Sequence, residues 1–143
     1  MITSALDAQA GTELSVVSFP ITLYRLVMAA GGNRDFNAIH HNRDHARATG
    51  APDAYANTLF LMGMWERAIS EWTGTTGRIV AIRGFRMVRF TTVGTTAVVK
   101  GAVKTTDTDR GIITFAISTA DAEGCTVGPG EVDVVFGIAG QDG

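Results

Sequence analysis

The stretch 57-NTLFLMGMWERAISEWTG-74 decides the fold class, because it predicts one long helix whose first half carries no charged side chain. The second half is amphipathic, with a polar stripe that consists of Glu66, Arg67, Ser70 and Glu71. A helical segment that is apolar on every side has to be covered on every side. Asn57 and Thr58 both favour a helix start. We therefore predict a helix that begins at this pair and is largely enclosed.

Downstream of this helix, alternating apolar and polar residues rich in β-branched side chains are typical of strands. Four segments have this pattern: residues 78–91, 96–107, 111–121 and 125–139. The connections "DTDRG" (107–111) and "DAEG" (121–124) predict tight hairpins. Upstream, the segment 13–19 predicts a fifth strand.

An antiparallel sheet that curls around a central helix explains both predictions: about five strands joined by hairpins, and one enclosed helix. This α+β arrangement is the hotdog fold. The chain by itself is expected to cover only half of this helix. We therefore expect a second hotdog unit to pack alongside and form a dimer.

Shorter helices are predicted on either side of the histidine-rich stretch described below. Thr22 is a suitable N-cap for a helix that stops at Gly31 or Gly32. Asn42 is a suitable N-cap for a second, short helix that Gly50 can end.

The composition limits the classes of protein to which the chain can belong. The 143 residues, 45% of them hydrophobic, predict one domain over 1–143, of which 1–12 are expected to be flexible. A single cysteine excludes an internal disulfide and fits a reducing cytoplasm, and we find no leader-like segment. A net charge of −2 gives no electrostatic case for nucleic acid, and no apolar run is long enough to cross a membrane.

The stretch 33-NRDFNAIHHNRDHARATG-50 contains every histidine of the chain. A metal site would use His40, His41, Asp44 and His45. Against this hypothesis, the Asn42 cap places His41 outside the short helix, and no further histidine or cysteine completes a shell. We therefore expect no metal.

Asp35 and His40 lie on irregular backbone just before the short helix, where they can converge on one water molecule. A carboxylate and an imidazole can divide the proton transfers of water addition to a double bond between them. Phe36 and Ile39 could anchor this loop in the core. The alternative is that Asp35 and Asn37 merely form an Asx turn around a half-buried histidine, and spacing alone leaves both interpretations open.

The segment "DFNAIH" (35–40) closely resembles the D-F-N-P-[IL]-H motif of the MaoC-like (R)-specific enoyl-CoA hydratases. The resemblance continues through the helix at Asn57 and through "FTTVGTTAVVKGAV" (90–103), which is similar to their F-x-x-P-V-x-x-G-D turn. It covers about residues 15–137. Within the family, the chain looks most like the small catalytic subunit of bacterial hydratases that act on steroid side-chain CoA thioesters in cholesterol breakdown.

The resemblance implies a hotdog enzyme that adds water to a trans-2-enoyl-CoA, with (R) outcome, through Asp35 and His40. It implies that Asn37 supports the loop and that the N–H of Thr58, beside Asn57, polarises the thioester carbonyl. No cofactor is implied beyond the coenzyme A of the substrate. The implied assembly is a homodimer, or a heterotetramer with a larger hotdog-containing subunit.

Two positions depart from the family pattern. Ala38 stands where the motif has proline, which loosens the loop and leaves the chemistry intact. Asn57-Thr58 stands where typical members have His-Gly, which keeps a backbone N–H at this place but removes the conformational freedom of glycine.

Three arginines, Arg83, Arg86 and Arg89, fall within one predicted strand, so that the first and third share a face and the second takes the other. Arginines are suited to bind the phosphates of coenzyme A. The alternative is that they are solvated charges at an edge or interface.

Two other functions remain open at this stage: a non-catalytic hotdog subunit that completes a partner hydratase, and a hotdog acyl-CoA thioesterase. The large aromatic residues Tyr55, Trp65 and Trp72 are expected in the core or at an interface.

Overall fold

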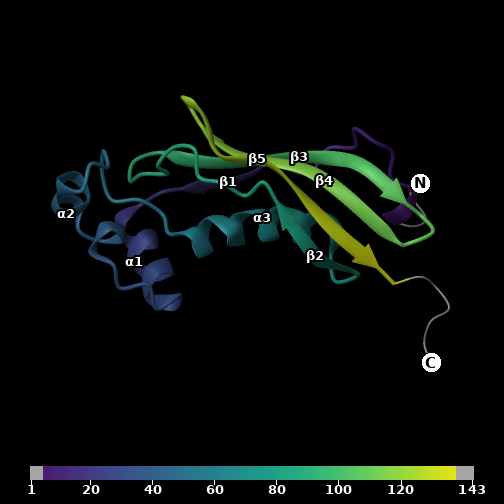
Figure 1. The fold of residues 1–143 in the computed structure, drawn as a ribbon, viewed down its shortest axis with the longest axis horizontal. Helices are drawn as coiled ribbons and strands as arrows, with labels where there is room; N and C mark the ends of the chain where they lie inside the picture. Colours follow the sequence, from purple (N-terminus) through teal and green to yellow (C-terminus); the bar gives the residue numbers. More distant parts are fainter. Residues whose placement is uncertain (1–4, 138–143) are drawn as a thin grey trace.

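The computed structural model describes residues 5–137, which form a curled antiparallel sheet with helices on one side (Figure 1). The five strands are β1 (Val17–Pro20), β2 (Gly77–Arg83), β3 (Thr96–Asp107), β4 (Ile112–Asp121) and β5 (Gly124–Phe136). The helices are η1 (Ala5–Asp7), α1 (Leu23–Gly32), η2 (Ala38–His40), α2 (Arg43–Ala48) and α3 (Thr58–Thr73). The predicted elements are therefore all present.

The strand order is β1-β3-β4-β5-β2, and every neighbouring pair is antiparallel. Both predicted hairpins are present, because β3 turns into β4 and β4 turns into β5. The helix α3 lies along one face of the sheet, while α1 and α2 lie together beyond one end of it (Figure 1). This is the hotdog arrangement expected from the sequence.

The core lies between α3 and the sheet face that it covers. Trp65 is fully buried there, and its indole Nε1–H donates a 2.9 Å hydrogen bond to the hydroxyl of Thr119 on β4. Trp72 packs edge-on against Phe115 and Phe136. Both tryptophans therefore belong to the core, as expected, and the one polar group that Trp65 buries has a partner.

The helix starts are those that the sequence predicts. The side chains of Thr22, Asn42 and Asn57 each accept a backbone N–H three residues further on, as N-cap residues do. The end of α1 differs slightly, because Gly31 and Gly32 are still helical and Asn33 is the C-cap.

The predicted strand over 78–91 is wrong beyond Arg83. Gly84 has a φ of 66°, and a Cβ there would lie 3.0 Å from the carbonyl oxygen of Pro129. The chain leaves the sheet at this glycine, and Met87 returns only as an isolated bridge to Val127.

Both ends of the described chain differ from the prediction. Residues 5–12 are not loose as expected, since the N–H of Gly11 donates to Val103 and Thr12 accepts from the N–H of Val103. The first strand begins at Val17 rather than at Glu13, which forms only an isolated bridge. Residues 1–4 and the end of the last predicted strand, 138–139, lie outside the described residues.

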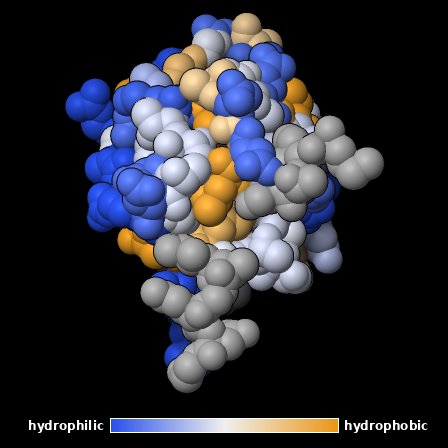
Figure 2. All heavy atoms as spheres, turned by 90° about the vertical axis from the view of Figure 1, so that its right-hand side faces the viewer, coloured by the Kyte–Doolittle hydropathy of each residue, from blue (hydrophilic) through white to orange (hydrophobic). Residues whose placement is uncertain are grey.

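Figure 2 shows the end of the molecule at which β3 turns into β4. A narrow strip of apolar atoms reaches the surface there between hydrophilic flanks. Over residues 5–137, no helix has both the length and the apolar character that a membrane crossing requires.

Candidate active site

Asp35 is positioned by the way in which α1 ends. The N–H of Asp35 donates to the carbonyl of Ala30 at 2.8 Å, and the N–H of Arg34 donates to the carbonyl of Gly31 at 3.1 Å. Arg34 has a φ of 56°, in the left-handed region that usually takes glycine. This is the paired hydrogen-bond pattern of a Schellman helix end. The backbone of Asp35 is therefore fixed relative to α1.

Asn37 holds the next turn of the loop. Its N–H donates to Asp35 Oδ1 at 3.4 Å, and its own Oδ1 accepts the N–H of Ile39 at 3.2 Å, which caps η2. Phe36 points outward and is 77% exposed. The expectation that Phe36 anchors the loop in the core is therefore wrong for this chain by itself, and hydrogen bonds shape the loop instead.

His40 is buried between Asp35 and Tyr55. Its Nδ1 lies 2.8 Å from the carbonyl oxygen of Tyr55, and its Nε2 lies 3.0 Å from Asp35 Oδ2. A carbonyl oxygen only accepts hydrogen bonds, so Nδ1 carries a hydrogen. The contact between Nε2 and the carboxylate then also needs a hydrogen, because two lone pairs would repel. A hydrogen bond therefore joins the two side chains.

Asn57 links this pair to the start of α3. Its Oδ1 accepts the N–H of Phe60 at 2.9 Å and the amide of Asn33 at 3.3 Å, while its Nδ2 donates to Asp35 Oδ2 at 3.3 Å. The two donors on Oδ1 fix the orientation of the amide, so that its NH₂ group faces Asp35. Asn33 was not predicted, since nothing in the sequence joins it to a residue 24 positions away.

The N-terminus of α3 opens beside this network. Within the described chain, the N–H groups of Thr58 and Leu59 donate to no other residue. Free N–H groups and the helix dipole favour a negatively charged oxygen at such a place. The N–H of Thr58 is therefore free to donate to a ligand, and its role towards a thioester carbonyl stays a prediction.

Asp53 fixes the segment that carries the Tyr55 carbonyl. Its carboxylate receives Nε and Nη2 of Arg43 at 2.8 and 2.7 Å, Nη2 of Arg47 at 3.2 Å and the N–H of Ala54 at 2.8 Å. The hydrogen bond from Arg43, helped by the Ala54 N–H, holds the pKa of Asp53 at about 2, although burial acts in the opposite direction. Sequence analysis missed this residue because its partners lie on α2.

The low pKa of Asp53 predicts how stability depends on pH. A carboxyl whose pKa is lower in the folded chain contributes stability above its unfolded value of about 3.9, and loses it as pH falls towards 2. As the pH falls from about 3.9 to about 2, we expect the free energy of unfolding of the wild type to fall by about 2 kcal/mol relative to that of the Asp53→Asn variant. Urea unfolding between pH 6 and 2 measures it.

The control for this experiment is Asp109→Asn, because Asp109 is exposed in the turn between β3 and β4 and forms no ion pair within the described residues. We expect this variant to follow the wild type at every pH. Equal pH dependence in wild type and Asp53→Asn would contradict the assigned role of Asp53.

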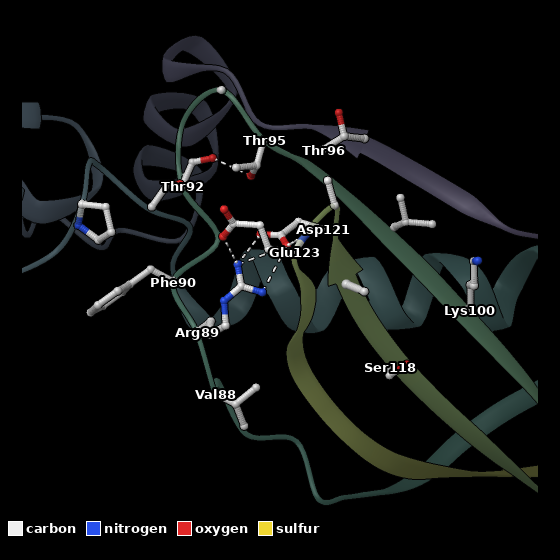
Figure 3. Close-up of a pocket in the computed structure, with 15 residues that line it drawn as sticks. Val88, Arg89, Phe90, Thr92, Thr95, Thr96, Lys100, Ser118, Asp121 and Glu123 are labelled. Atoms are coloured by element: carbon white, nitrogen blue, oxygen red, sulfur yellow. Dashed lines mark hydrogen bonds and ion pairs between the residues drawn. The ribbon is translucent and has the colours of Figure 1, made fainter.

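The three arginines predicted to bind phosphate are not alike. Arg83 binds Asp133 and Glu131 on β5, which hold its pKa above the ordinary value. Arg89 points at the β4–β5 turn, where it binds Asp121 and Glu123 (Figure 3).

Arg86 is exposed, and its side chain makes no ion pair within the described part of the chain. Since β2 ends at Arg83, the predicted alternation of faces along one strand does not exist. Of the three arginines, Arg86 is the one whose charge is not already neutralised.

Among residues 5–137, no three His, Cys, Asp or Glu side chains come close enough together to hold a metal ion. His41 and His45 are exposed, whereas His40 is buried. The histidines of the 33–50 stretch therefore separate into one buried residue that faces Asp35 and two at the surface.

The described fold matches solved structures of hydratases. A chain of the ChsH1-ChsH2 complex from Mycobacterium tuberculosis superposes with a TM-score of 0.84 and 26% identity, over 90% of this chain and 98% of that one. The (R)-hydratase from A. caviae superposes with a TM-score of 0.81 and 17% identity, over 90% and 97% of the two chains. No family model matches the chain. Fold and relatives nevertheless agree: the chain has the hotdog fold and is similar to MaoC-like hydratases and dehydratases.

Among curated proteins, the chain is similar to the beta subunit of 3-oxo-4,17-pregnadiene-20-carboxyl-CoA hydratase from Mycobacterium tuberculosis. The two are 37% identical over 62 residues, which are 43% of this chain. The match spans about half of that relative's length (47%).

Proposed function

We propose that this chain is a hydro-lyase that adds water to a trans-2-enoyl-CoA and gives a 3-hydroxyacyl-CoA. One observation carries the proposal: the 3.0 Å contact between Asp35 Oδ2 and His40 Nε2, beside the free N–H groups at the start of α3. Hydratases among the relatives support the same reaction class.

Asp35 is the base in this proposal. Its Oδ2 already receives His40 and Asn57, whereas Oδ1 accepts only the long bond from the N–H of Asn37. The side chain is 37% exposed, so that water reaches it. Oδ1 takes a proton from this water, and the water oxygen forms a bond to Cβ of the enoyl group.

His40 is the acid. Its Nδ1–H stays on the Tyr55 carbonyl, and its Nε2–H goes to Cα of the thioester. Asp35 then holds a proton and His40 is neutral. The proton on Oδ1 leaves to solvent, which reaches the half-exposed carboxylate, and Nε2 takes up a proton, so that the pair regains its starting state with one water consumed.

The negative charge that develops on the thioester oxygen is stabilised by the N–H of Thr58 at the start of α3. Donors that are already in place where charge develops contribute strongly to catalysis. Thr58 presents its backbone, so the absence of glycine's conformational freedom leaves the donor intact. Arg86 is free to meet a phosphate of coenzyme A.

The acyl group in this proposal is a bulky steroid side-chain acyl group. The named substrate of the curated relative is a CoA thioester of this kind, and that relative supports the choice. A short linear acyl group is the alternative that the assay below distinguishes.

The test is incubation with crotonyl-CoA and with 3-oxo-4,17-pregnadiene-20-carboxyl-CoA. Loss of the enoyl absorbance with a 3-hydroxyacyl-CoA product supports the proposal. Free coenzyme A would instead identify a thioesterase. An assembly that hydrates at the same rate with wild-type chain and with Asp35→Asn would identify a non-catalytic subunit.

The chain also presents an apolar surface for a partner subunit, for which we propose a larger hotdog-containing protein. Tyr24, Val27 and Met28 lie on one side of α1 and are 73%, 45% and 59% exposed. Two solved complexes, ChsH1-ChsH2 and the dehydratase HadBC, support a heteromeric assembly.

A substitution at Tyr24 tests this assembly. A glutamate there would place a charge in the buried centre of the interface, so we expect Tyr24→Glu to weaken assembly by about tenfold or more. Tyr24→Phe keeps the apolar area and should assemble normally. Light scattering of the co-purified assembly measures both, and a Tyr24→Glu variant that assembles as the wild type does would contradict the proposal.

A further inference from the structure

The His40 ring is held from outside its own loop. The helix η2 has only three residues, too few to be stable by itself. The carbonyl oxygen of Tyr55 accepts the Nδ1–H of His40 at 2.8 Å, and the Tyr55 ring packs edge-on against the imidazole, with 5.4 Å between the ring centroids. Tyr55 therefore contacts His40 through both its backbone and its side chain.

The ring of Tyr55 is also in contact with Phe90. The centroids of these two rings are 4.6 Å apart, and their planes are inclined by 48°. Packed aromatic rings have centroids about 4.5–7 Å apart, so this pair is among the closer ones. Among residues 5–137, no ring contact joins Phe90 to His40 directly. Any effect of Phe90 on the imidazole therefore passes through Tyr55.

A short antiparallel ribbon keeps the two aromatic residues together. Two backbone hydrogen bonds of 2.9 and 3.0 Å, one on either side of Tyr55, join residues 54–56 to residues 91–93. Tyr55 is paired with Thr92 in this ribbon. Since alternate side chains of an extended chain lie on one face, Phe90 lies on the same face as the residue that pairs with Tyr55. The ribbon thus fixes Phe90 beside the Tyr55 ring.

Arg89 joins this ribbon to the sheet. Its Nη2 donates to Asp121 Oδ2 at 2.9 Å, and its Nη1 donates to the carbonyl oxygen of Gly124 at 3.2 Å. The side chain of Asp121 is 4% exposed, so water screens this ion pair little. Arg89 points towards the β4–β5 turn, whereas Phe90 points away from it (Figure 3). The sheet therefore sets the place from which Phe90 reaches Tyr55.

Phe90 has open space beside it. It is 38% exposed, lies outside the hydrophobic core cluster and lines an open hollow of about 1110 Å³ next to the β4–β5 turn. The core therefore does not require an aromatic ring at this position. A smaller side chain would leave the Tyr55 ring room to change its rotamer and to lose the edge contact with the imidazole.

We infer that Phe90 is a positioning residue for the proposed hydration. By packing against the Tyr55 ring it keeps that ring against His40, and the imidazole then keeps its Nε2 at Asp35. The hydrogen bond from Nδ1 alone would leave the imidazole free to tilt about that bond, and the edge contact with the Tyr55 ring prevents this. The inference rests on the proposed function, because His40 is the acid in it.

The hydrogen on His40 Nδ1 gives a readout that does not depend on turnover. It is buried and bonded to the Tyr55 carbonyl, so it should give a slowly exchanging NMR signal in the isotope-labelled protein, whereas the exposed His41 and His45 should not. Exchange of such a hydrogen follows local opening of the structure. In Phe90→Leu we expect it to exchange faster by about tenfold or more.

The kinetic test uses the same variant with the thioester that the wild type hydrates faster. We expect Phe90→Leu to lower kcat by about tenfold, because a displaced acid is less well aligned with Cα. KM should change by less than about twofold, since no substrate contact is removed. Phe90→Tyr keeps the ring and should match the wild type in rate and exchange. Adding Phe90→Leu to Tyr55→Leu should slow the enzyme no further, because Phe90 acts through Tyr55.

Val88→Ala is the matched control. Val88 is 45% exposed and lines the same hollow two residues before Phe90, but it is not part of the aromatic pair. We expect Val88→Ala to equal the wild type in kcat, in KM and in the exchange of the His40 Nδ1–H. Circular dichroism checks that both variants are folded.

Four results decide the inference. Slower turnover together with faster exchange in Phe90→Leu supports it. Unchanged kcat, or a lower kcat without faster exchange, overturns it. An equal loss in Val88→Ala would show general loosening of the segment and also overturns it. A wild type that hydrates neither thioester overturns the proposed function, and the exchange comparison then decides by itself whether Phe90 holds His40.

Discussion

Asp35→Asn and His40→Ala are each expected to lower the rate of hydration by about 10²–10⁴-fold. Asparagine cannot take a proton from water, and alanine has no group that protonates Cα. Neither residue belongs to the hydrophobic core between α3 and the sheet, so we expect the chain to stay folded. Initial rates with an enoyl-CoA, together with circular dichroism, measure the two effects.

The control for these variants is His45→Ala, because His45 is exposed on α2. It should hydrate at the rate of the wild type. Near-normal turnover in either Asp35→Asn or His40→Ala would contradict the assignment of Asp35 and His40 as the catalytic pair.

Asn57→Asp is expected to lower the rate by about 10²-fold, since displacing a catalytic group by about 1 Å is enough to do so. The new carboxylate keeps an acceptor for the N–H of Phe60, so the helix cap is retained. The NH₂ group that now faces Asp35 Oδ2 at 3.3 Å would become a second negatively charged oxygen. The two carboxylates repel each other and move Asp35 out of place.

The matched control is Asn42→Asp. Asn42 caps α2 in the same way through the N–H of His45, but it does not contact Asp35. We expect both variants to unfold within about 1 kcal/mol of the wild type, and only Asn57→Asp to lose activity. Similar rates for the two would show that Asn57 is a cap and nothing more.

The sequence predicts the fold well because its signals are local. Caps such as Asn42 and Asn57 act within three residues, and the alternation in β3 to β5 repeats every second residue. The end of β2 was missed because Gly84 turns the chain where Pro129, from a distant strand, comes close. A contact between residues so far apart in the sequence produces no periodic pattern from which it could be predicted.

The candidate site was predictable only in part. Asp35 and His40 stand in one short motif, and the structure brings their side chains into contact. Their convergence on one water molecule stays a prediction. Asn33 and Asp53 were missed because they act through partners on other elements. Phe36 was placed wrongly because an apolar residue in a loop does not reveal whether its own chain or another molecule covers it.

The hydrogen-bond network of the candidate site uses side chains from one continuous segment, residues 33–57. The sheet supports this segment but contributes no side chain to the network. The proposed catalytic residues and the sheet therefore come from separate segments of the chain. Replacement of this one piece would remove the reactive groups and leave the curled sheet intact.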